Sequence, residues 1–128
     1  MSDTKVVLII EDNEQNMELA SYLLEEADLE VRKATCGEDA WRELERGVPD
    51  IVLMDMSLGG EDGLALAGEV RRLHGVGFPI LALTAHAMRG DRERFLAGGC
   101  DGYISKPINT KTFVDEVQHW LLAGGRKE

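Results

Sequence analysis

The feature that most constrains the fold is an uninterrupted apolar run, Ile51 to Met54, that ends on the carboxylate of Asp55. Pro49 precedes the run, and Gly59 and Gly60 follow it. A short apolar run bounded by such residues is typical of a buried central strand. Ligands of open parallel sheets bind at the carboxyl ends of the strands, which is where Asp55 would lie. A charged residue in that position is a candidate functional group.

Other segments have strand character, and most of them also end next to a polar side chain. They are Lys5–Ile10 before Glu11 and Asp12, Glu30–Ala34, Ile80–Leu83 before Thr84, and Gly102–Ser105 before Lys106. Between the strands, apolar residues recur at helical spacing, and Asn13 is placed as the N-cap of the first helix. The predicted helices carry Met17, Ala20, Leu24 and Ala27; Ala40, Trp41 and Leu44; Leu66, Val70 and Leu73; the segment Asp91–Ala97; and Phe113, Val117, Trp120 and Leu121.

Strands and helices alternate five times, which predicts an α/β fold with a doubly wound parallel sheet and helices on both faces. No repeat, low-complexity tract or linker divides the 128 residues, so we expect one domain over 1–128, with a core of about 5–122 and no output domain. The tail from Gly124 to Glu128 is expected to fray.

The excess of acidic residues argues against some classes of binding partner. Asp and Glu number 24 against 14 Lys and Arg, a formal net charge of −10, which argues against direct binding to nucleic acid or to an anionic membrane. It suits protein partners and a cation. The start of the chain has no apolar stretch of signal-peptide length, so we expect a cytoplasmic protein, with Cys36 and Cys100 as free thiols.

The polar residues at the strand ends would gather on one edge of a parallel sheet. Three carboxylates there, from Glu11, Asp12 and Asp55, repel one another, so they must raise their pKa values, spread apart or share a cation. Ligands that are all oxygen favour Mg²⁺ over Ca²⁺ at such a site. With the ammonium of Lys106 and the hydroxyl of Thr84, these are the groups needed to place and neutralise a transferring phosphoryl group. A carboxylate can be the nucleophile, which gives an acyl phosphate.

Each signal has an ordinary alternative when it is taken alone. Glu11 and Asp12 could simply precede a helix and interact with its dipole. Thr84 could be a turn residue, and Lys106 could be a solvated charge. The order and spacing of the whole set are much more specific than any member.

The set also carries a resemblance to a known family. Over roughly residues 5 to 122 the chain resembles the CheY-like receiver domains of two-component response regulators. The matching segments are Ile9-Ile10-Glu11-Asp12-Asn13, Val52-Leu53-Met54-Asp55-Met56, Asp62-Gly63, Leu83-Thr84-Ala85 and Tyr103-Ile104-Ser105-Lys106-Pro107. The stretch from Leu83 to Asp91, with Gly98-Gly99-Cys100, is most similar to stand-alone DivK-like receivers and to the receivers of hybrid kinases.

The resemblance implies a flavodoxin-like sheet of order 2-1-3-4-5 with five helices, and a role for each residue of the set. Asp55 would accept a phosphoryl group from a phosphohistidine on a sensor histidine kinase or histidine phosphotransferase. It implies further that Glu11, Asp12, Asp55 and the backbone carbonyl of Ser57 hold Mg²⁺, that Lys106 and Thr84 contact the phosphoryl oxygens, and that Tyr103 is the switch aromatic. Such a domain is a phosphoacceptor switch that assists its own phosphorylation and dephosphorylation, not an enzyme with a separate substrate.

Two positions near Asp55 and Thr84 are expected to tune dephosphorylation, as they do in the family: Ser57 and His86. For His86 the hypothesis is that the ring orients or excludes the attacking water, although a residue in that place can also simply border the cleft. The Lys106–Pro107 bond is cis in the family, while an ordinary trans bond is compatible with the sequence.

One departure from the family lies in the loop after Asp55. Gly59 stands where the family usually has proline, and Gly60 and Glu61 follow. Because proline restricts φ and glycine releases it, we expect a looser loop with an added acid near the metal. A tolerated turn variant is the alternative.

Phosphorylation of Asp55 adds only about one negative charge. We therefore expect new hydrogen bonds to Thr84 and Lys106 to drive the switch, with Tyr103 filling the space that Thr84 vacates. The downstream protein would bind the face of the fourth helix, fifth strand and fifth helix, where Arg89, Arg92 and Arg94 could mark the partner surface or a solvated helix face.

Three other functions are alternatives for a chain with this pattern. A haloacid-dehalogenase-type phosphatase needs a second Asp at the place of Ser57, and a nucleotide- or flavin-binding flavodoxin relative needs a phosphate loop at the place of Glu11 and Asp12. An unphosphorylated docking module on the same fold stays open, although the complete polar set argues against it.

Overall fold

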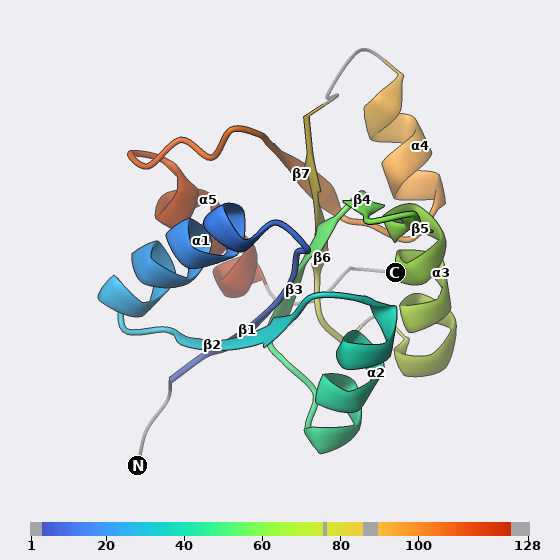
Figure 1. The fold of residues 1–128 in the computed structure, drawn as a ribbon, viewed down its shortest axis with the longest axis horizontal. Coiled ribbons are helices and arrows are strands. Elements are labelled where there is room, and N and C mark those ends of the chain that lie inside the picture. Colours follow the sequence, from blue (N-terminus) through green and yellow to red (C-terminus); the bar gives the residue numbers. More distant parts are fainter. Residues whose placement is uncertain (1–3, 76, 86–89, 124–128) are drawn as a thin grey trace.

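The computed structural model describes residues 4–75, 77–85 and 90–123. A central five-stranded sheet lies between two layers of helices (Figure 1). The elements are β1 Val6–Ile10, α1 Glu14–Glu26, β2 Glu30–Ala34, α2 Gly37–Arg46, β3 Ile51–Asp55, β4 Ser57–Leu58, β5 Glu61–Asp62, α3 Gly63–His74, β6 Ile80–Thr84, α4 Asp91–Ala97, β7 Gly102–Ser105 and α5 Phe113–Ala123.

The sheet has the order β2-β1-β3-β6-β7 with every pairing parallel. This confirms the predicted order 2-1-3-4-5, because β4 and β5 form a separate antiparallel hairpin. β3 is central and all five of its residues are buried. Because helices cover both faces of this strand, neither face is exposed to solvent, and its sequence is therefore apolar from Ile51 to Met54.

Helices cover both faces of the sheet. Figure 1 shows α1 and α5 on one side and α2, α3 and α4 on the other. Alternate residues of each strand serve the two faces. In β1, Val7 and Ile9 belong to the core with α1 and α5, whereas Leu8 and Ile10 belong to the core with α2, α3 and α4.

The helix starts follow local side-chain chemistry. Asn13 is the N-cap of α1, as predicted, and its Oδ1 accepts a hydrogen bond from the N–H of Asn16 at 2.9 Å. Asp62 caps α3 in the same way, accepting from Leu64 and Ala65. The predicted buried face of α1 is also present, with Met17, Ala20 and Leu24 in the core.

The predicted inner face of α3 was partly wrong. Leu73 is 58% exposed, and the buried residues of α3 are Gly63, Ala67 and Val70. At 3.6 residues per turn, Gly63, Ala67 and Val70 lie on one stripe of the helix, and Leu73 lies to the side of that stripe. At the start of the helix the approach to β3 is close, because a Cβ at residue 63 would overlap the backbone carbonyl of Asp55.

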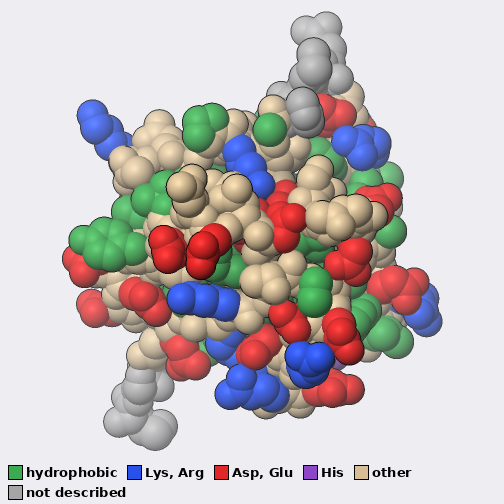
Figure 2. Space-filling view, viewed as in Figure 1, with side chains coloured by type: hydrophobic (Ala, Val, Ile, Leu, Met, Phe, Trp, Pro, Cys, Tyr) green, Lys and Arg blue, Asp and Glu red, His purple; other side chains and the backbone are tan. Residues whose placement is uncertain are grey.

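Within the described residues, every helix is too short or too polar to cross a lipid bilayer. Figure 2 shows acidic side chains spread over one face of the molecule, with Lys and Arg side chains between them. The acidic charge is therefore distributed and does not form a single patch on this face. The tail 124–128, predicted to fray, lies outside the described residues.

Candidate functional site

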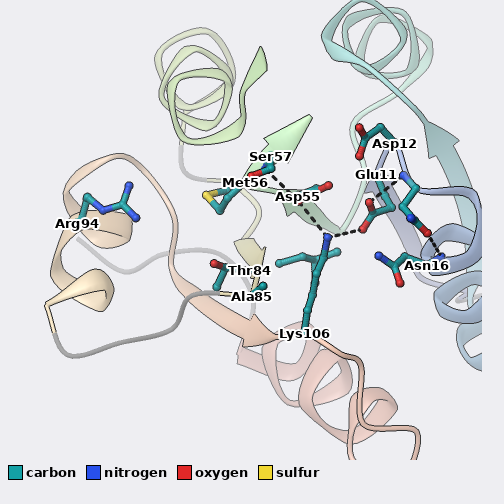
Figure 3. Close-up of a pocket in the computed structure, with 12 residues that line it drawn as sticks. Glu11, Asp12, Asn16, Asp55, Met56, Ser57, Thr84, Ala85, Arg94 and Lys106 are labelled. Carbon is teal, nitrogen blue, oxygen red and sulfur yellow. Dashed lines mark hydrogen bonds and ion pairs between the residues drawn. The ribbon is translucent and has the colours of Figure 1, made fainter. Parts of the chain in front are cut away.

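The carboxyl edge of the sheet brings the predicted polar residues together (Figure 3). Asp55 and Thr84 are the last residues of β3 and β6, Glu11 directly follows β1, and Lys106 directly follows β7. The strand register aligns these ends, because Asp55 pairs with Leu83 and Thr84 pairs with Ser105. Residues far apart in the sequence thus meet at one place, as the parallel topology requires.

These side chains border a cleft of about 330 Å³. Its described lining consists of Glu11, Asp12, Asn13, Asn16, Asp55, Met56, Ser57, Leu83, Thr84, Ala85, Arg94 and Lys106. Glu11, Asp55 and Thr84 are buried at its floor, whereas Asp12 and Ser57 are exposed. The cleft is therefore open to a ligand while its central carboxylate is shielded from bulk water.

Lys106 links two of the carboxylates. Its Nζ lies 3.0 Å from Oε1 of Glu11 and 3.1 Å from Oδ1 of Asp55. Burial alone would lower the pKa of Lys106, but the bonds to Glu11 and Asp55 outweigh it and raise that pKa above its ordinary value. Lys106 is therefore a fixed positive charge at the floor of the cleft.

The surroundings of Glu11 disfavour its ionised form. Burial, together with the nearby carboxylate of Asp55, raises its pKa above the ordinary value of 4.5. The N–H of Asn13, 3.0 Å from Oε2, and the ammonium of Lys106 act in the opposite direction. The net direction is upward because the effect of burial, with that of Asp55, outweighs these two contacts.

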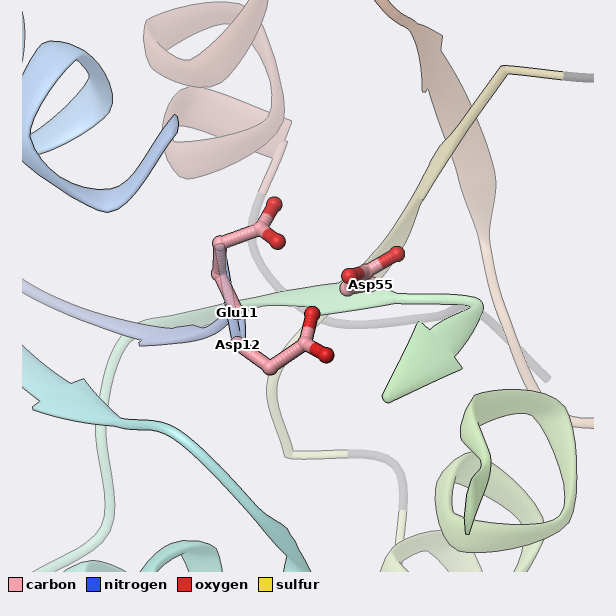
Figure 4. Close-up of side chains that lie close together, drawn as sticks. All are labelled: Glu11, Asp12 and Asp55. Atoms are coloured by element: carbon pink, nitrogen blue, oxygen red, sulfur yellow. The ribbon is translucent and has the colours of Figure 1, made fainter. Parts of the chain in front are cut away.

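The acid cluster fits a divalent cation. Glu11, Asp12 and Asp55 each offer a carboxylate oxygen within 4.8 Å of the others (Figure 4). With Lys106, they leave a formal excess of two negative charges when all are ionised. A small ion that prefers oxygen ligands and keeps several waters, such as Mg²⁺, suits this set.

The chain after Asp55 forms the β4–β5 hairpin, with two residues in each strand and with Gly59, at φ 51°, and Gly60, at φ 98°, in the turn. The expected looseness of this segment stays a prediction. Positive φ at both turn positions is the geometry that glycine supplies without strain, and it matches the twist of the paired strands.

The expectation of an added acid near the metal was wrong. Glu61 is not part of the acid cluster that the described residues form; its Oε1 accepts a hydrogen bond from the N–H of Gly37 at 2.9 Å. Ser57 lies beside Asp55, and its N–H donates to Oδ1 of that residue at 3.0 Å.

Comparison with known proteins decides the family. The sequence profile of the response regulator receiver domain matches residues 7–118. The polar-differentiation response regulator DivK of Brucella ovis is 38% identical over 124 residues, which cover 92% of this chain and 97% of that protein. The chain belongs to the response regulator receiver domain family.

Solved structures agree. A response regulator from Chloroflexus aurantiacus has a TM-score of 0.86 at 30% identity, covering 94% of this chain and 99% of that one. The chemotaxis protein CheY4 of Vibrio cholerae has a TM-score of 0.85 at 25% identity, covering 91% of this chain and 98% of that one. The resemblance seen in the sequence, including the likeness to DivK, is confirmed. The chain is a receiver domain of two-component signalling, and this membership disfavours the phosphatase and flavin-binding alternatives.

The remaining predictions concern Tyr103, the Lys106–Pro107 bond, His86 and Arg89. Tyr103 on β7 is half-buried, and its ring lies 6.2 Å from the ring of Phe95 on α4, tilted by 56°. The Lys106–Pro107 bond is cis, as the family resemblance implies. His86 and Arg89 lie outside the described residues.

Sequence reasoning missed two features of the receiver site. Arg94 was considered only as part of a partner surface, but it also lines the cleft, opposite Lys106 in Figure 3. The contact of Glu61 with Gly37 joins residues 24 positions apart. No local sequence pattern predicts either feature, because both depend on how α4 and α2 pack beside the carboxyl edge of the sheet.

Proposed function

We propose that Asp55 accepts a phosphoryl group from a phosphohistidine of a sensor histidine kinase or histidine phosphotransferase, in a reaction that requires Mg²⁺. The observation that carries this proposal is the position of Asp55: a buried carboxylate at the end of β3, paired with Lys106 and grouped with Glu11 and Asp12. No other arrangement in the described residues combines a carboxylate nucleophile, a cation site and a fixed ammonium.

In the proposed transfer, an oxygen of Asp55 attacks the phosphorus in line with the departing histidine nitrogen. A P–O bond forms, the P–N bond breaks, and the imidazole takes a proton from water as it leaves. Bound Mg²⁺ would neutralise the charge of the transferring group. Glu11, Asp12, Asp55 and the carbonyl of Ser57 are the proposed ligands, and Thr84 and Lys106 are the proposed contacts of the phosphoryl oxygens.

The buried pair between Lys106 and Asp55 supports a direct role for the lysine. Its Nζ is already 3.1 Å from Oδ1 of the acceptor, in a setting with little water. Positive charge that is fixed before the reaction needs no reorganisation when charge develops on the phosphoryl group. Lys106 then binds the phosphoryl oxygens with almost no movement of its own.

Phosphorylation is proposed to act on the face formed by α4, β7 and α5. Charge-assisted hydrogen bonds contribute about 1.5–3 kcal/mol each, so two of them, from Thr84 and Lys106, approach the ~5.5 kcal/mol that inverts a 1:99 equilibrium. Thr84 pairs with Ser105 across β6 and β7, and half-buried Tyr103 lies two residues before Ser105. A downstream protein would bind this face in the phosphorylated state.

Ser57 and His86 are proposed to set the lifetime of the acyl phosphate. Ser57 is exposed at the cleft and its backbone N–H already contacts Asp55. The rate of dephosphorylation in Ser57→Ala and His86→Ala would be compared with that of the native chain. An unchanged rate in both variants would remove this part of the proposal.

The acceptor role is tested by incubation with acetyl phosphate, with and without Mg²⁺, followed by electrophoresis in a gel that retards phosphoproteins. The native chain is expected to give one retarded band only with Mg²⁺, and Asp55→Asn is expected to give none. A retarded band of equal strength in Asp55→Asn would contradict the proposal.

A further inference from the structure

The β4–β5 hairpin contacts two separate parts of the molecule. At its turn, Gly59 lies against the acid cluster, since a Cβ on this residue would be 3.0 Å from Oδ2 of Asp12. On its second strand, Glu61 reaches the start of α2. The hairpin therefore lies between the proposed metal site and a helix that contributes no residue to that site.

The contact with α2 takes the place of a local helix cap. Cys36 is the N-cap residue of α2 and makes no side-chain capping hydrogen bond. Oε1 of Glu61 accepts the hydrogen bond from the N–H of Gly37 instead, at 2.9 Å. A carboxylate at a helix start satisfies an unpaired N–H and interacts favourably with the helix dipole.

The contact also requires glycine at the first position of α2. A Cβ on Gly37 would lie 2.7 Å from Oε2 of Glu61, so any larger residue would push the carboxylate away. Displacement of a flexible side-chain end costs little by itself. An alanine at this position would therefore remove the contact without disturbing the backbone of the helix.

The other side of the hairpin is anchored in the core. Leu58 pairs with Glu61 across the hairpin and is 2% exposed, in the same buried cluster as Ala40 and Leu44 of α2. The hairpin thus has an apolar side chain in the core that α2 shares and a charged side chain at the start of α2. Ser57 and Gly59 lie on the strand and turn that these contacts fix.

We infer that Glu61 is a positioning residue for the proposed magnesium site: by capping α2, it holds the hairpin so that Gly59 and the carbonyl of Ser57 stay beside Asp12 and Asp55. This inference rests on the proposed function, because it concerns the same metal site. The segment with Gly59 and Gly60 would then support the proposed magnesium site.

The test is Mg²⁺ affinity, measured by isothermal titration calorimetry on the unphosphorylated full chain. Glu61→Ala is expected to weaken Mg²⁺ binding about tenfold, the lower end of the range for residues that support metal ligands from outside the coordination shell. Glu61→Gln keeps a carbonyl oxygen that can accept the same N–H and is expected to restore most of the affinity. Glu38→Ala is the matched control, because Glu38 is exposed, carries the same charge in the first turn of α2, and forms its ion pair with Arg42 of the same helix.

A second route removes the contact from the other side. Gly37→Ala is expected to weaken Mg²⁺ binding as Glu61→Ala does, and to cause no further loss in the Glu61→Ala background, because the carboxylate that the new Cβ would meet is gone. Far-UV circular dichroism of each variant reports whether α2 and the fold are intact.

The outcomes separate the two proposals. Native affinity in Glu61→Ala, equal weakening in Glu38→Ala, or full additivity of Gly37→Ala with Glu61→Ala would overturn the positioning role alone. Absence of Mg²⁺ binding by the native chain would overturn the magnesium site itself, and the positioning role with it.

Discussion

At the scale of single residues, the ionisation of Glu11 is where the fold and the site conflict. The unfolded chain ionises this carboxyl near the ordinary glutamate value of 4.5, whereas burial and Asp55 hold its pKa higher in the folded protein. Between those two values the folded state binds more protons than the unfolded state. The free energy of unfolding therefore falls as the pH rises through this window.

The neutral isostere Glu11→Gln removes this dependence. In metal-free buffer, we expect the free energy of unfolding of the variant, relative to that of the native chain, to increase as the pH rises from 4.5 through the raised pKa of Glu11. Urea unfolding in EDTA at a series of pH values measures it. A difference that stays constant over the series would mean that Glu11 ionises normally in the folded protein.

A second residue pair is structural and independent of the cleft. Arg71 on α3 forms an ion pair with Asp101, and its guanidinium also donates to the carbonyls of Gly99 and Phe78, at 2.9 and 2.6 Å. Asp101 further accepts the N–H of Ile80 at 2.8 Å. The pair fastens α3 to the starts of β6 and β7, at the end of the sheet away from Asp55.

Breaking this pair is expected to be costly. Arg71→Met removes the cation paired with the buried carboxylate of Asp101 and should lower the free energy of unfolding by about 3–5 kcal/mol. Arg72→Met is the matched control, because Arg72 pairs with Glu69 on the exposed side of the same helix and should change stability little. Chemical denaturation of both variants measures the difference. Similar stability for the two would show that the buried network is not needed.

At the scale of secondary-structure elements, helix starts carry a separable part of the stability. Asn13 caps α1 by accepting the N–H of Asn16 and is exposed, so its replacement disturbs little else. Asn13→Ala should lower the free energy of unfolding by about 1 kcal/mol. Asn13→Ser, which also caps and adds no charge beside the acid cluster, should keep most of the stability in thermal or urea unfolding. Equal losses in both variants would contradict a capping role.

The main elements were predictable from sequence because their signals are local. The apolar runs of β1, β3 and β6 each end next to a polar residue, and the parallel sheet places those residues on one edge. The positions of Glu11, Asp55 and Thr84 in the cleft follow from this alone. The roles proposed for them come from the family.

What sequence did not predict depends on packing between elements. Strands of two residues, such as β4 and β5, are too short to show a period, so the sequence did not predict the hairpin. The contact of Glu61 with Gly37 exists only because α2 lies beside the hairpin. Leu73 is exposed because the stripe of α3 that faces the sheet is formed by Gly63, Ala67 and Val70, and Leu73 lies to the side of it.

At the scale of the whole molecule, the proposed cation should stabilise the fold by binding only its folded state. Mg²⁺ at one hundred times its dissociation constant should raise the free energy of unfolding by about 2.7 kcal/mol. The same concentration should have a much smaller effect on Asp12→Asn, which removes one ligand of the acid cluster. Thermal unfolding with Mg²⁺ and with EDTA checks it, and an equal shift in both proteins would place the ion elsewhere.

The most direct test of the account locates the phosphoryl group chemically. Borohydride reduces an acyl phosphate to an alcohol but leaves a free carboxylate unchanged, so a phosphorylated aspartate becomes homoserine. After treatment with acetyl phosphate and Mg²⁺, followed by borohydride and peptide mass spectrometry, the account predicts homoserine at residue 55 and aspartate at residue 12. Reduction at another acidic residue, with residue 55 unchanged, would contradict it.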